Sequence, residues 1–133
     1  QLAYGKDFTY VEKAFTTKLK QAKRLSDDEL ERRATSSSRK PGTRSTSAVQ
    51  FDRDPWVVEY AKRRAKGVCQ LCKEPAPFIN SQGEPYLEVH HIIWLAEGGE
   101  DTLGNTVALC PNCHRKMHVV NCKDDVEILL GTV

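Results

Sequence analysis

The sequence contains no apolar run that approaches the ~18 residues a membrane-spanning helix needs. It also has no secretory signal pattern at its start, and it begins with Gln1 instead of methionine. These absences argue against a membrane partner and lead us to expect a cytoplasmic location. The first residue leads us to expect a piece of a longer protein, and 133 residues are about the length of one domain.

The zinc-peptidase motif H-E-x-x-H is absent as well. In that motif two histidines one helical turn apart hold the metal, and the glutamate takes the proton from water. No comparable glutamate base is found near the histidines of this sequence, so we expect no peptidase chemistry.

Five cysteines are present, and four of them form two C-x-x-C pairs, Cys69 with Cys72 and Cys110 with Cys113. In a chain without secretion signals this spacing favours a metal site over disulfides. A C-x-x-C turn presents two thiolates to adjacent corners of a tetrahedron, so the two pairs predict a closed structural Zn²⁺ site. We expect the fifth cysteine, Cys122, to be a free reduced thiol.

All four histidines fall within residues 87–118. His114 and His118 are four residues apart on a predicted helix, so both face the same side. His90 and His91 are adjacent on a predicted strand, so their side chains point to opposite faces. This pattern suits metal-assisted hydrolysis, in which one group holds the ion while its neighbour takes a proton from water.

Charge is distributed unevenly along the chain. Residues 1–50 carry eleven Lys or Arg against six Asp or Glu, whereas residues 51–133 carry nine against twelve. Long-range attraction for nucleic acid would therefore come mainly from the N-terminal part. The alternative is that its basic surface is only the solvated face of a helix.

We divide the chain into three parts. Residues 1–34 are predicted to be a basic helical segment, with an apolar stripe on a helix at residues 6–24 and a second helix capped by Ser26. Residues 35–50 are rich in Ser, Thr and Arg and are expected to be a flexible linker. Residues 51–133 form the third part, which holds the cysteines and histidines.

A helix is predicted to begin at Asp54-Pro55, because aspartate caps helices and proline fits the first turn, and to end at Gly67. Its expected inner face consists of Val57, Tyr60, Ala61 and Ala65. Its remaining surface is basic, and it either contacts DNA or only keeps the helix soluble. The candidate DNA contacts are Lys62, Arg63, Arg64 and Lys66.

The elements predicted after this helix are short and mixed in type. They are a loop at 74–85, a strand at 86–93, an acidic loop at Gly98-Gly99, a strand at 106–109, a helix from Pro111 and a closing helix at 124–130. The mixture predicts an α+β fold.

The order and spacing of these residues resemble the HNH endonuclease family, the ββα-metal nucleases. The likeness covers about residues 51–120 and rests on the runs E-V-H-H-I and C-P-N-C-H-R-K-M-H, the Gly-Gly loop and Asn105. The C-x-x-C pairs are similar to those of the McrA-like restriction endonuclease subset. The resemblance implies a small, treble-clef-like α+β nuclease domain that zinc stabilises. The helical segment predicted at residues 1–34 would precede it as an arm.

The resemblance also implies a role for each site residue. His91 corresponds to the general base that activates water, and Asn105 to the residue whose amide fixes the loop and helps to hold that base. The implied ligands of the catalytic ion are His90, His114 and His118. That ion would be Mg²⁺, Mn²⁺ or another transition-series divalent metal. Arg115 and Lys116 on the same helix are candidate DNA contacts, or only a solvated face.

We therefore expect a metal-dependent endonuclease that acts on double-stranded DNA in restriction or defence, with modified-cytosine DNA as one candidate substrate. The alternatives are a zinc-dependent DNA-binding module without catalysis, or an HNH nuclease of phage packaging or a mobile element. One site per chain implies a homodimer or successive nicks if both strands are cut. No residue obviously reads a base, so a specificity domain is expected upstream of Gln1.

Overall fold

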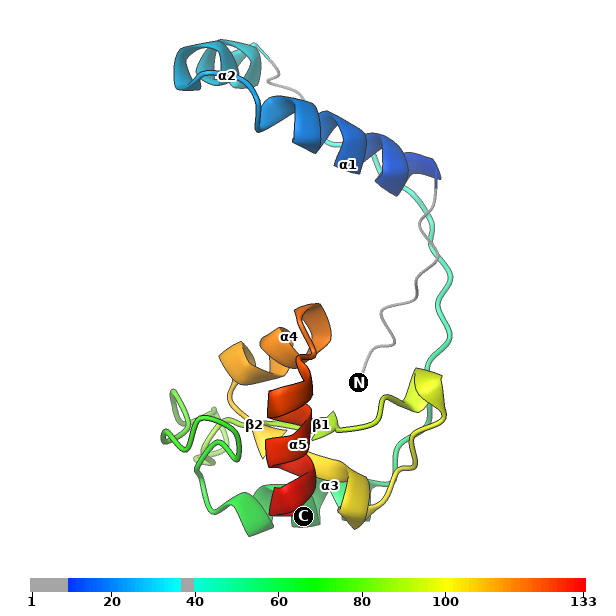
Figure 1. The fold of residues 1–133 in the computed structure, drawn as a ribbon, viewed down its shortest axis with the longest axis vertical. Helices are drawn as coiled ribbons and strands as arrows, with labels where there is room; N and C mark the ends of the chain where they lie inside the picture. Colours follow the sequence, from blue (N-terminus) through cyan, green and yellow to red (C-terminus); the bar gives the residue numbers. More distant parts are fainter. Residues whose placement is uncertain (1–9, 37–39) are drawn as a thin grey trace. The chain divides into compact units, whose positions relative to one another are not determined.

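The computed structural model describes residues 10–36 and 40–133 (Figure 1). The chain divides into two compact units, of which one ends at Ala48 and the other contains Val49–Val133.

The N-terminal unit contains two helices, α1 (Tyr10–Ala22) and α2 (Asp27–Thr35). The first four residues of the helix predicted at 6–24 lie outside the described residues. The predicted cap of α2 is confirmed, because Ser26 Oγ accepts a hydrogen bond from the Glu29 amide at 3.2 Å. None of residues 13–36 is buried, so the apolar stripe of α1 forms no core within this segment.

The C-terminal unit begins with α3 (Pro55–Ala65), which residues 40–49 precede without helix or strand. The predicted start is confirmed, since Asp54 Oδ1 accepts the Trp56 N–H at 2.9 Å and proline occupies the first turn. The helix ends at Lys66 and Gly67, which both have left-handed backbone.

The inner face of α3 differs from the predicted one at one position. Ala61 and Ala65 are buried as expected, but Tyr60 is 54% exposed. Arg64 turns toward the sheet instead, because its position lies beside Ala61 and Ala65 at helical spacing. The face that packs on the sheet is therefore built from small residues and one arginine.

A two-stranded antiparallel sheet forms the centre of the unit, from β1 (Glu88–His91) and β2 (Thr106–Leu109). His90 pairs with Val107 in this sheet, and His91 pairs with Thr106 at its end. Two adjacent histidines thus point to opposite faces of β1, as the strand prediction required.

The predicted strand at 86–93 is longer than β1 at both ends. The amide of Tyr86 bonds to the carbonyl of Phe78 at 2.9 Å, so this residue belongs to the preceding loop. The amide of Ile92 bonds to the carbonyl of Asn105 at 2.9 Å, which starts the following loop. The second predicted strand agrees with β2.

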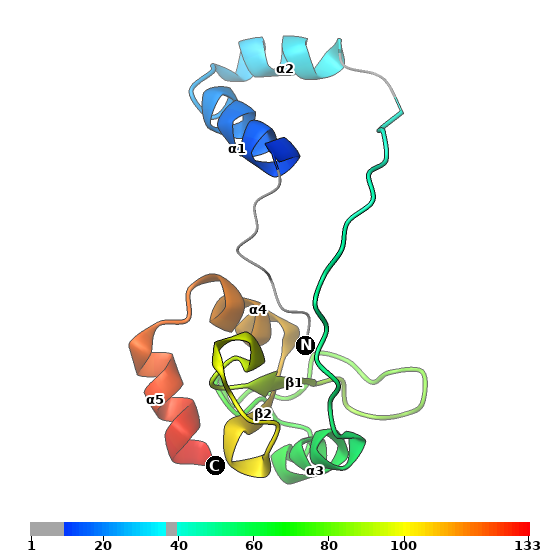
Figure 2. The same ribbon diagram turned by 90° about the vertical axis from the view of Figure 1, so that its right-hand side faces the viewer.

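Two helices follow β2, namely α4 (Pro111–Val119) and α5 (Lys123–Thr132). Two short 3₁₀ helices, η1 (Leu95–Glu97) and η2 (Leu103–Asn105), lie in the loop between the strands. Helices α3 and α4 lie on opposite sides of the sheet (Figures 1 and 2). This confirms the α+β class and the ββα order of β1, β2 and α4.

The hydrophobic core of this unit is small and includes part of the predicted zinc site. Its buried members are Ala65, Cys69, Leu87, Ile92, Val107, Ala108, Leu109, Met117 and Leu129. The half-buried Cys110 and Cys113 pack against it. A core of this size buries little apolar surface and so contributes little to stability. A metal held by the cysteines would add stability to the same unit. Among the described residues, no helix is long and apolar enough to cross a membrane.

Candidate active site

The four predicted zinc cysteines come together in one cluster. Their sulfur atoms, from Cys69, Cys72, Cys110 and Cys113, all lie within 4.8 Å of one another. The sulfurs of Cys72 and Cys110 are 4.0 Å apart, and sulfurs around a tetrahedral zinc ion are separated by roughly 3.8 Å. The cluster therefore has the size of a closed four-thiolate zinc site.

The surroundings of these thiols shift their pKa values in opposite directions. Burial and the neighbouring Cys110 thiol raise the pKa of Cys113. Burial opposes ionisation of Cys69 too, but hydrogen bonds from the backbone of Cys110, Cys72 and Leu71 outweigh it and bring the pKa of Cys69 to about 7. Four adjacent thiolates need a positive charge between them, and the donor set fits structural zinc.

The upstream cysteine turn is joined to the sheet by Gln70. Its amide donates to the carbonyl of Ala108 at 3.1 Å, and its side-chain Oε1 accepts the Ala108 N–H at 2.8 Å. The turn thereby pairs with the edge of β2 that β1 leaves open. The cysteine cluster and the strand that precedes α4 are held as one body.

Three of the four histidines form a second cluster between β1 and α4. The ring nitrogens of His90, His114 and His118 lie within 4.8 Å of one another. The Nε2 atoms of His114 and His118 are 3.1 Å apart, as the spacing of four on a helix allows. Trp94, which the sequence did not single out, stacks on His118 with ring centroids 5.2 Å apart.

The state of these imidazoles fits a metal ligand set. Both ring nitrogens of His90 are buried and have no hydrogen-bond partner. Burial, with the nearby His114 and His118, lowers the pKa of His90 to about 3. Burial and His114 likewise lower the pKa of His118 to about 4. Neutral imidazoles gathered in a desolvated site are what a divalent transition metal binds.

Glu88 is a site residue that the sequence reading missed. Its Oε1 lies 2.8 Å from His114 Nδ1, and its Oε2 accepts a hydrogen bond from the Tyr86 hydroxyl at 2.7 Å. A signal was present, because Glu88 and His90 are two apart on a strand and so share a face.

A carboxylate on the far nitrogen of a metal-binding histidine orients the ring and raises its basicity. Glu88 has this relation to His114, whose Nε2 then faces the cluster. Burial would raise the pKa of Glu88, but its bonds with Tyr86 and His114 lower it overall. An ionised glutamate therefore fixes which nitrogen of His114 can bind an ion.

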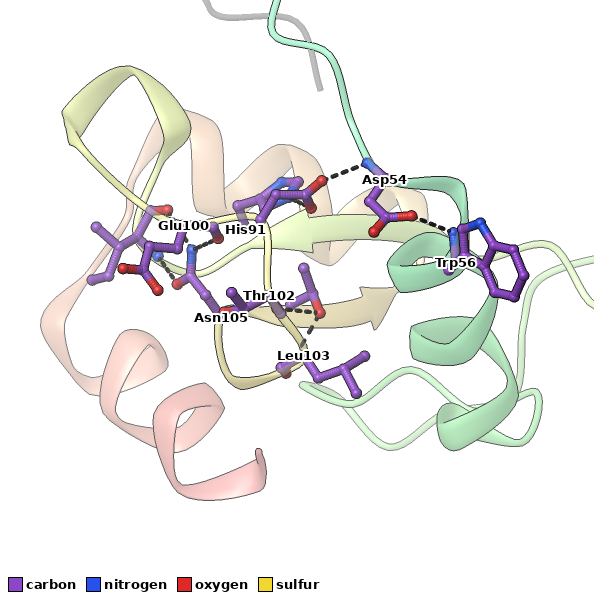
Figure 3. A network of polar contacts seen from close by, with 10 residues as sticks. Asp54, Trp56, His91, Glu100, Thr102, Leu103 and Asn105 are labelled. Atoms are coloured by element: carbon purple, nitrogen blue, oxygen red, sulfur yellow. Dashed lines mark hydrogen bonds and ion pairs between the residues drawn. The ribbon is translucent and has the colours of Figure 1, made fainter.

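His91 lies on the other face of β1 and has a different partner. Its Nε2 is 2.8 Å from Asp101 Oδ1 (Figure 3), and its side chain is fully buried. The second oxygen of Asp101 accepts the backbone N–H of Asp54 at 2.6 Å. Burial favours the neutral acid, but His91 and the Asp54 amide outweigh it and lower the pKa of Asp101. The sequence predicts an acidic loop here, but Asp101 was not among the predicted site residues.

Asn105 ties both ends of the loop between the strands. Its Oδ1 accepts the Ile93 N–H at 2.8 Å, and its Nδ2 donates to the carbonyls of Ile93 and Glu100 at 3.0 and 2.8 Å (Figure 3). Every hydrogen-bonding direction of this amide except one acceptor position is used. These bonds fix both ends of the loop, and the catalytic role expected of Asn105 stays a prediction.

Several predicted DNA contacts have other partners. Arg64 donates to the carbonyls of Leu103 and Thr106 at 3.2 and 2.7 Å, so it holds the loop to β2 instead of presenting its charge outward. Arg63 pairs with Glu59 at 3.0 Å, and Lys116 pairs with Asp125 at 2.9 Å. Lys62, Lys66 and Arg115 stay predicted contacts.

Residues 69–119 match the family model described as HNH endonuclease. The type IV methyl-directed restriction enzyme EcoKMcrA of Escherichia coli (strain K12) is 47% identical over 93 residues, which cover 69% of this chain and 34% of that protein. Anaredoxin of Nostoc sp. (strain PCC 7120 / SAG 25.82 / UTEX 2576) is 32% identical over 76 residues, which cover 54% of this chain and 90% of that protein.

A solved structure has a similar fold. The type IV phosphorothioation-dependent restriction endonuclease ScoMcrA superposes with a TM-score of 0.54 at 32% identity, over 60% of this chain and 17% of that one. This chain thus spans about a third of EcoKMcrA and less than a fifth of ScoMcrA.

Proposed function

Since this chain belongs to the HNH endonuclease family, we propose that it cleaves DNA phosphodiester bonds with His91 as general base and Asn105 as the residue that fixes the catalytic loop. The observation that carries the proposal is the division of β1 into two faces. On one face, His90 has two buried nitrogens without partners beside His114 and His118. On the other, a carboxylate holds His91.

The proposed roles follow from these surroundings. An ionised carboxylate only accepts hydrogen bonds, so Asp101 keeps the proton of neutral His91 on Nε2 and the basic lone pair on Nδ1. His91 Nδ1 takes a proton from water, the water oxygen bonds to phosphorus, and the bond from phosphorus to the 3′ oxygen breaks. The His91 side chain is fully buried. The proposal therefore also requires that DNA binding opens a path by which this water reaches His91 Nδ1.

His90, His114 and His118 would hold the catalytic divalent ion. When bound, such an ion supplies positive charge that stabilises the phosphate and the leaving oxygen. Three imidazoles without a carboxylate favour Mn²⁺ or another transition-series ion over Mg²⁺. The four cysteines would hold structural Zn²⁺.

The proposal for the DNA substrate and the biological role rests on the similarity to EcoKMcrA and ScoMcrA. EcoKMcrA is named as methyl-directed and ScoMcrA as phosphorothioation-dependent, and both are restriction enzymes. We infer that this chain acts on modified double-stranded DNA in a cytoplasmic restriction system, with modified cytosine as the first candidate. Because the chain spans about a third of EcoKMcrA, recognition of the modification would belong to a domain outside it. Because each chain has one site, cleavage of both strands would require a homodimer or successive nicks.

The test is cleavage of plasmid DNA by zinc-loaded protein with Mg²⁺, Mn²⁺ or Co²⁺ added. Unmodified, methylated and hydroxymethylated plasmids are compared, and nicking of at least one is expected with a transition-series ion. A chain that binds these DNAs but nicks none with any ion would be a DNA-binding module, and the proposal would fail.

A further inference from the structure

We propose that Asp101 is a positioning residue for His91, and that one carboxylate couples the general base to the backbone where the chain enters α3. This inference rests on the proposed function. Asp101 itself lies outside the two ligand clusters and would touch neither ion nor substrate.

The first bond sets the chemistry of the ring. Asp101 Oδ1 lies 2.8 Å from His91 Nε2, with the His91 side chain fully buried and that of Asp101 19% exposed. Because the carboxylate only accepts hydrogen bonds, the ring must donate from Nε2. The same bond also limits rotation of the imidazole. Without the carboxylate, the neutral ring could carry its proton on either nitrogen, and only one tautomer leaves Nδ1 basic.

The second bond gives the carboxylate a fixed orientation. Asp101 Oδ2 accepts the Asp54 N–H at 2.6 Å, and the Asp54 side chain in turn accepts the Trp56 N–H at 2.9 Å as the cap of α3 (Figure 3). Asp101 is therefore held between β1 and the first turn of α3. Because its anchor is a backbone N–H and not a mobile side chain, Asp101 Oδ1 keeps a fixed direction toward His91.

The backbone beside Asp101 is fixed independently. Asn105 Nδ2 donates to the carbonyl of Glu100 at 2.8 Å, directly before Asp101 in the chain. Asn105 also holds both backbone groups of Ile93, two residues after His91. Asn105 thus supports the base through Asp101, which gives a physical route for the holding role expected of that asparagine.

The test uses Asp101→Asn, because an amide keeps the size of the side chain but cannot accept two N–H bonds with both of its terminal atoms. The kcat for DNA cleavage is expected to fall roughly 10²- to 10⁴-fold, the scale seen when a carboxylate that orients a catalytic histidine is replaced by an amide. The KM for DNA should stay within about twofold, since Asp101 would not touch the substrate. Glu100→Gln, one residue away with an exposed side chain, is the matched control and should cleave like the parent.

A double variant separates positioning from structure. If Asp101 acts only through His91, then Asp101→Asn should cause no further loss of kcat in the His91→Ala background. A further tenfold loss there, or parental kcat in the single variant, would overturn the inference. A rise in KM that accounts for the whole loss of cleavage activity in Asp101→Asn would also overturn the inference.

A second readout does not require activity. Nitrogen chemical shifts of the histidine rings in zinc-loaded protein report the tautomer, with His91 identified from the His91→Ala spectrum. The parent should show His91 protonated on Nε2, and Asp101→Asn should show a mixture or the other tautomer. An unchanged tautomer in Asp101→Asn refutes the positioning role, even if the enzyme is inactive. If instead the histidine shifts are as expected but the parent protein does not nick DNA, only the proposed function is refuted. Should Asp101→Asn fail to fold, Asp101→Glu keeps the carboxylate and must retain the Nε2 tautomer.

Discussion

Adjacent residues on β1 have opposite surroundings because side chains alternate along a strand. His90 faces α4, where its nitrogens lie among two other imidazoles, and His91 faces Asp101. Glu88 lies two residues before His90, on the same face of β1, and contacts His114. In the proposed mechanism, this one four-residue strand would supply a metal ligand, the carboxylate that orients another ligand, and the base.

The Glu88 contact leads to a prediction at this scale. Glu88→Gln should weaken binding of the catalytic ion by about 10- to 100-fold, the range for removal of a carboxylate behind a metal-binding histidine. Titration of zinc-loaded protein with Co²⁺, followed by its visible absorption, measures this. Glu84→Gln, in the exposed preceding loop, should bind Co²⁺ like the parent. Equal affinity of Glu88→Gln and the parent would show that Glu88 does not act on the ion.

At the scale of elements, the loop between β1 and β2 brings Asp101 and Asn105 to the face of β1 that carries His91. It contains η1 and η2 and is held by Asn105 from inside and by Arg64 from α3. Gly99 lies against the backbone of Ile93, where an added Cβ would be 1.8 Å from the Ile93 oxygen. Only glycine permits this approach, which places Asp101 opposite His91.

Replacement of this glycine is therefore expected to displace the loop. Gly99→Ala should lower the free energy of unfolding by about 1–3 kcal/mol, since the backbone must shift to admit the methyl group. It should also reduce the cleavage rate, because Asp101 follows two residues later. Gly104→Ala is the control in the same loop, where an added Cβ meets nothing within 4 Å. Equal thermal unfolding of the two variants would contradict the role given to Gly99.

How much of this arrangement the sequence could predict depends on the range of the contacts. The ligand sets rest on short spacings, namely C-x-x-C, four residues on a helix and alternation on a strand, so they were predictable. The partners of Asp101 and Arg64 were not, because these bonds join residues 10 to 47 positions apart. They depend on how the loop folds back, which local periodicity does not encode. Tyr60 was predicted to face inward from helical spacing alone, but it is 54% exposed.

At the scale of the whole molecule, the cysteine cluster and the hydrophobic core belong to one structure. Cys69 is fully buried in the core, while Gln70 beside it pairs with β2. The histidine cluster shares α4 with the cysteine cluster, since Cys110 caps that helix and His114 lies one turn on. Loss of zinc should therefore disturb the catalytic site through the fold.

The expected effect of removing one zinc ligand is large. Cys72→Ser should lose bound zinc and the cooperative thermal unfolding of Val49–Val133, because binding of structural zinc contributes on the order of 10 kcal/mol to folding. Zinc content and circular dichroism measure the two effects. Cys122→Ser removes the one cysteine outside the cluster and should keep both zinc and cooperativity. A folded, zinc-free Cys72→Ser protein would contradict a structural role for the metal.

The central claim is that the two faces of β1 divide metal binding from proton transfer. It is tested most directly by measuring Co²⁺ affinity and single-turnover DNA cleavage together in zinc-loaded His90→Ala and His91→Ala. His90→Ala is expected to lose both ion binding and cleavage, whereas His91→Ala is expected to bind Co²⁺ within about threefold of the parent and still lose at least about 10²-fold in cleavage rate. Cleavage by His91→Ala at the parental rate, or equal loss of Co²⁺ affinity in both variants, would contradict the division.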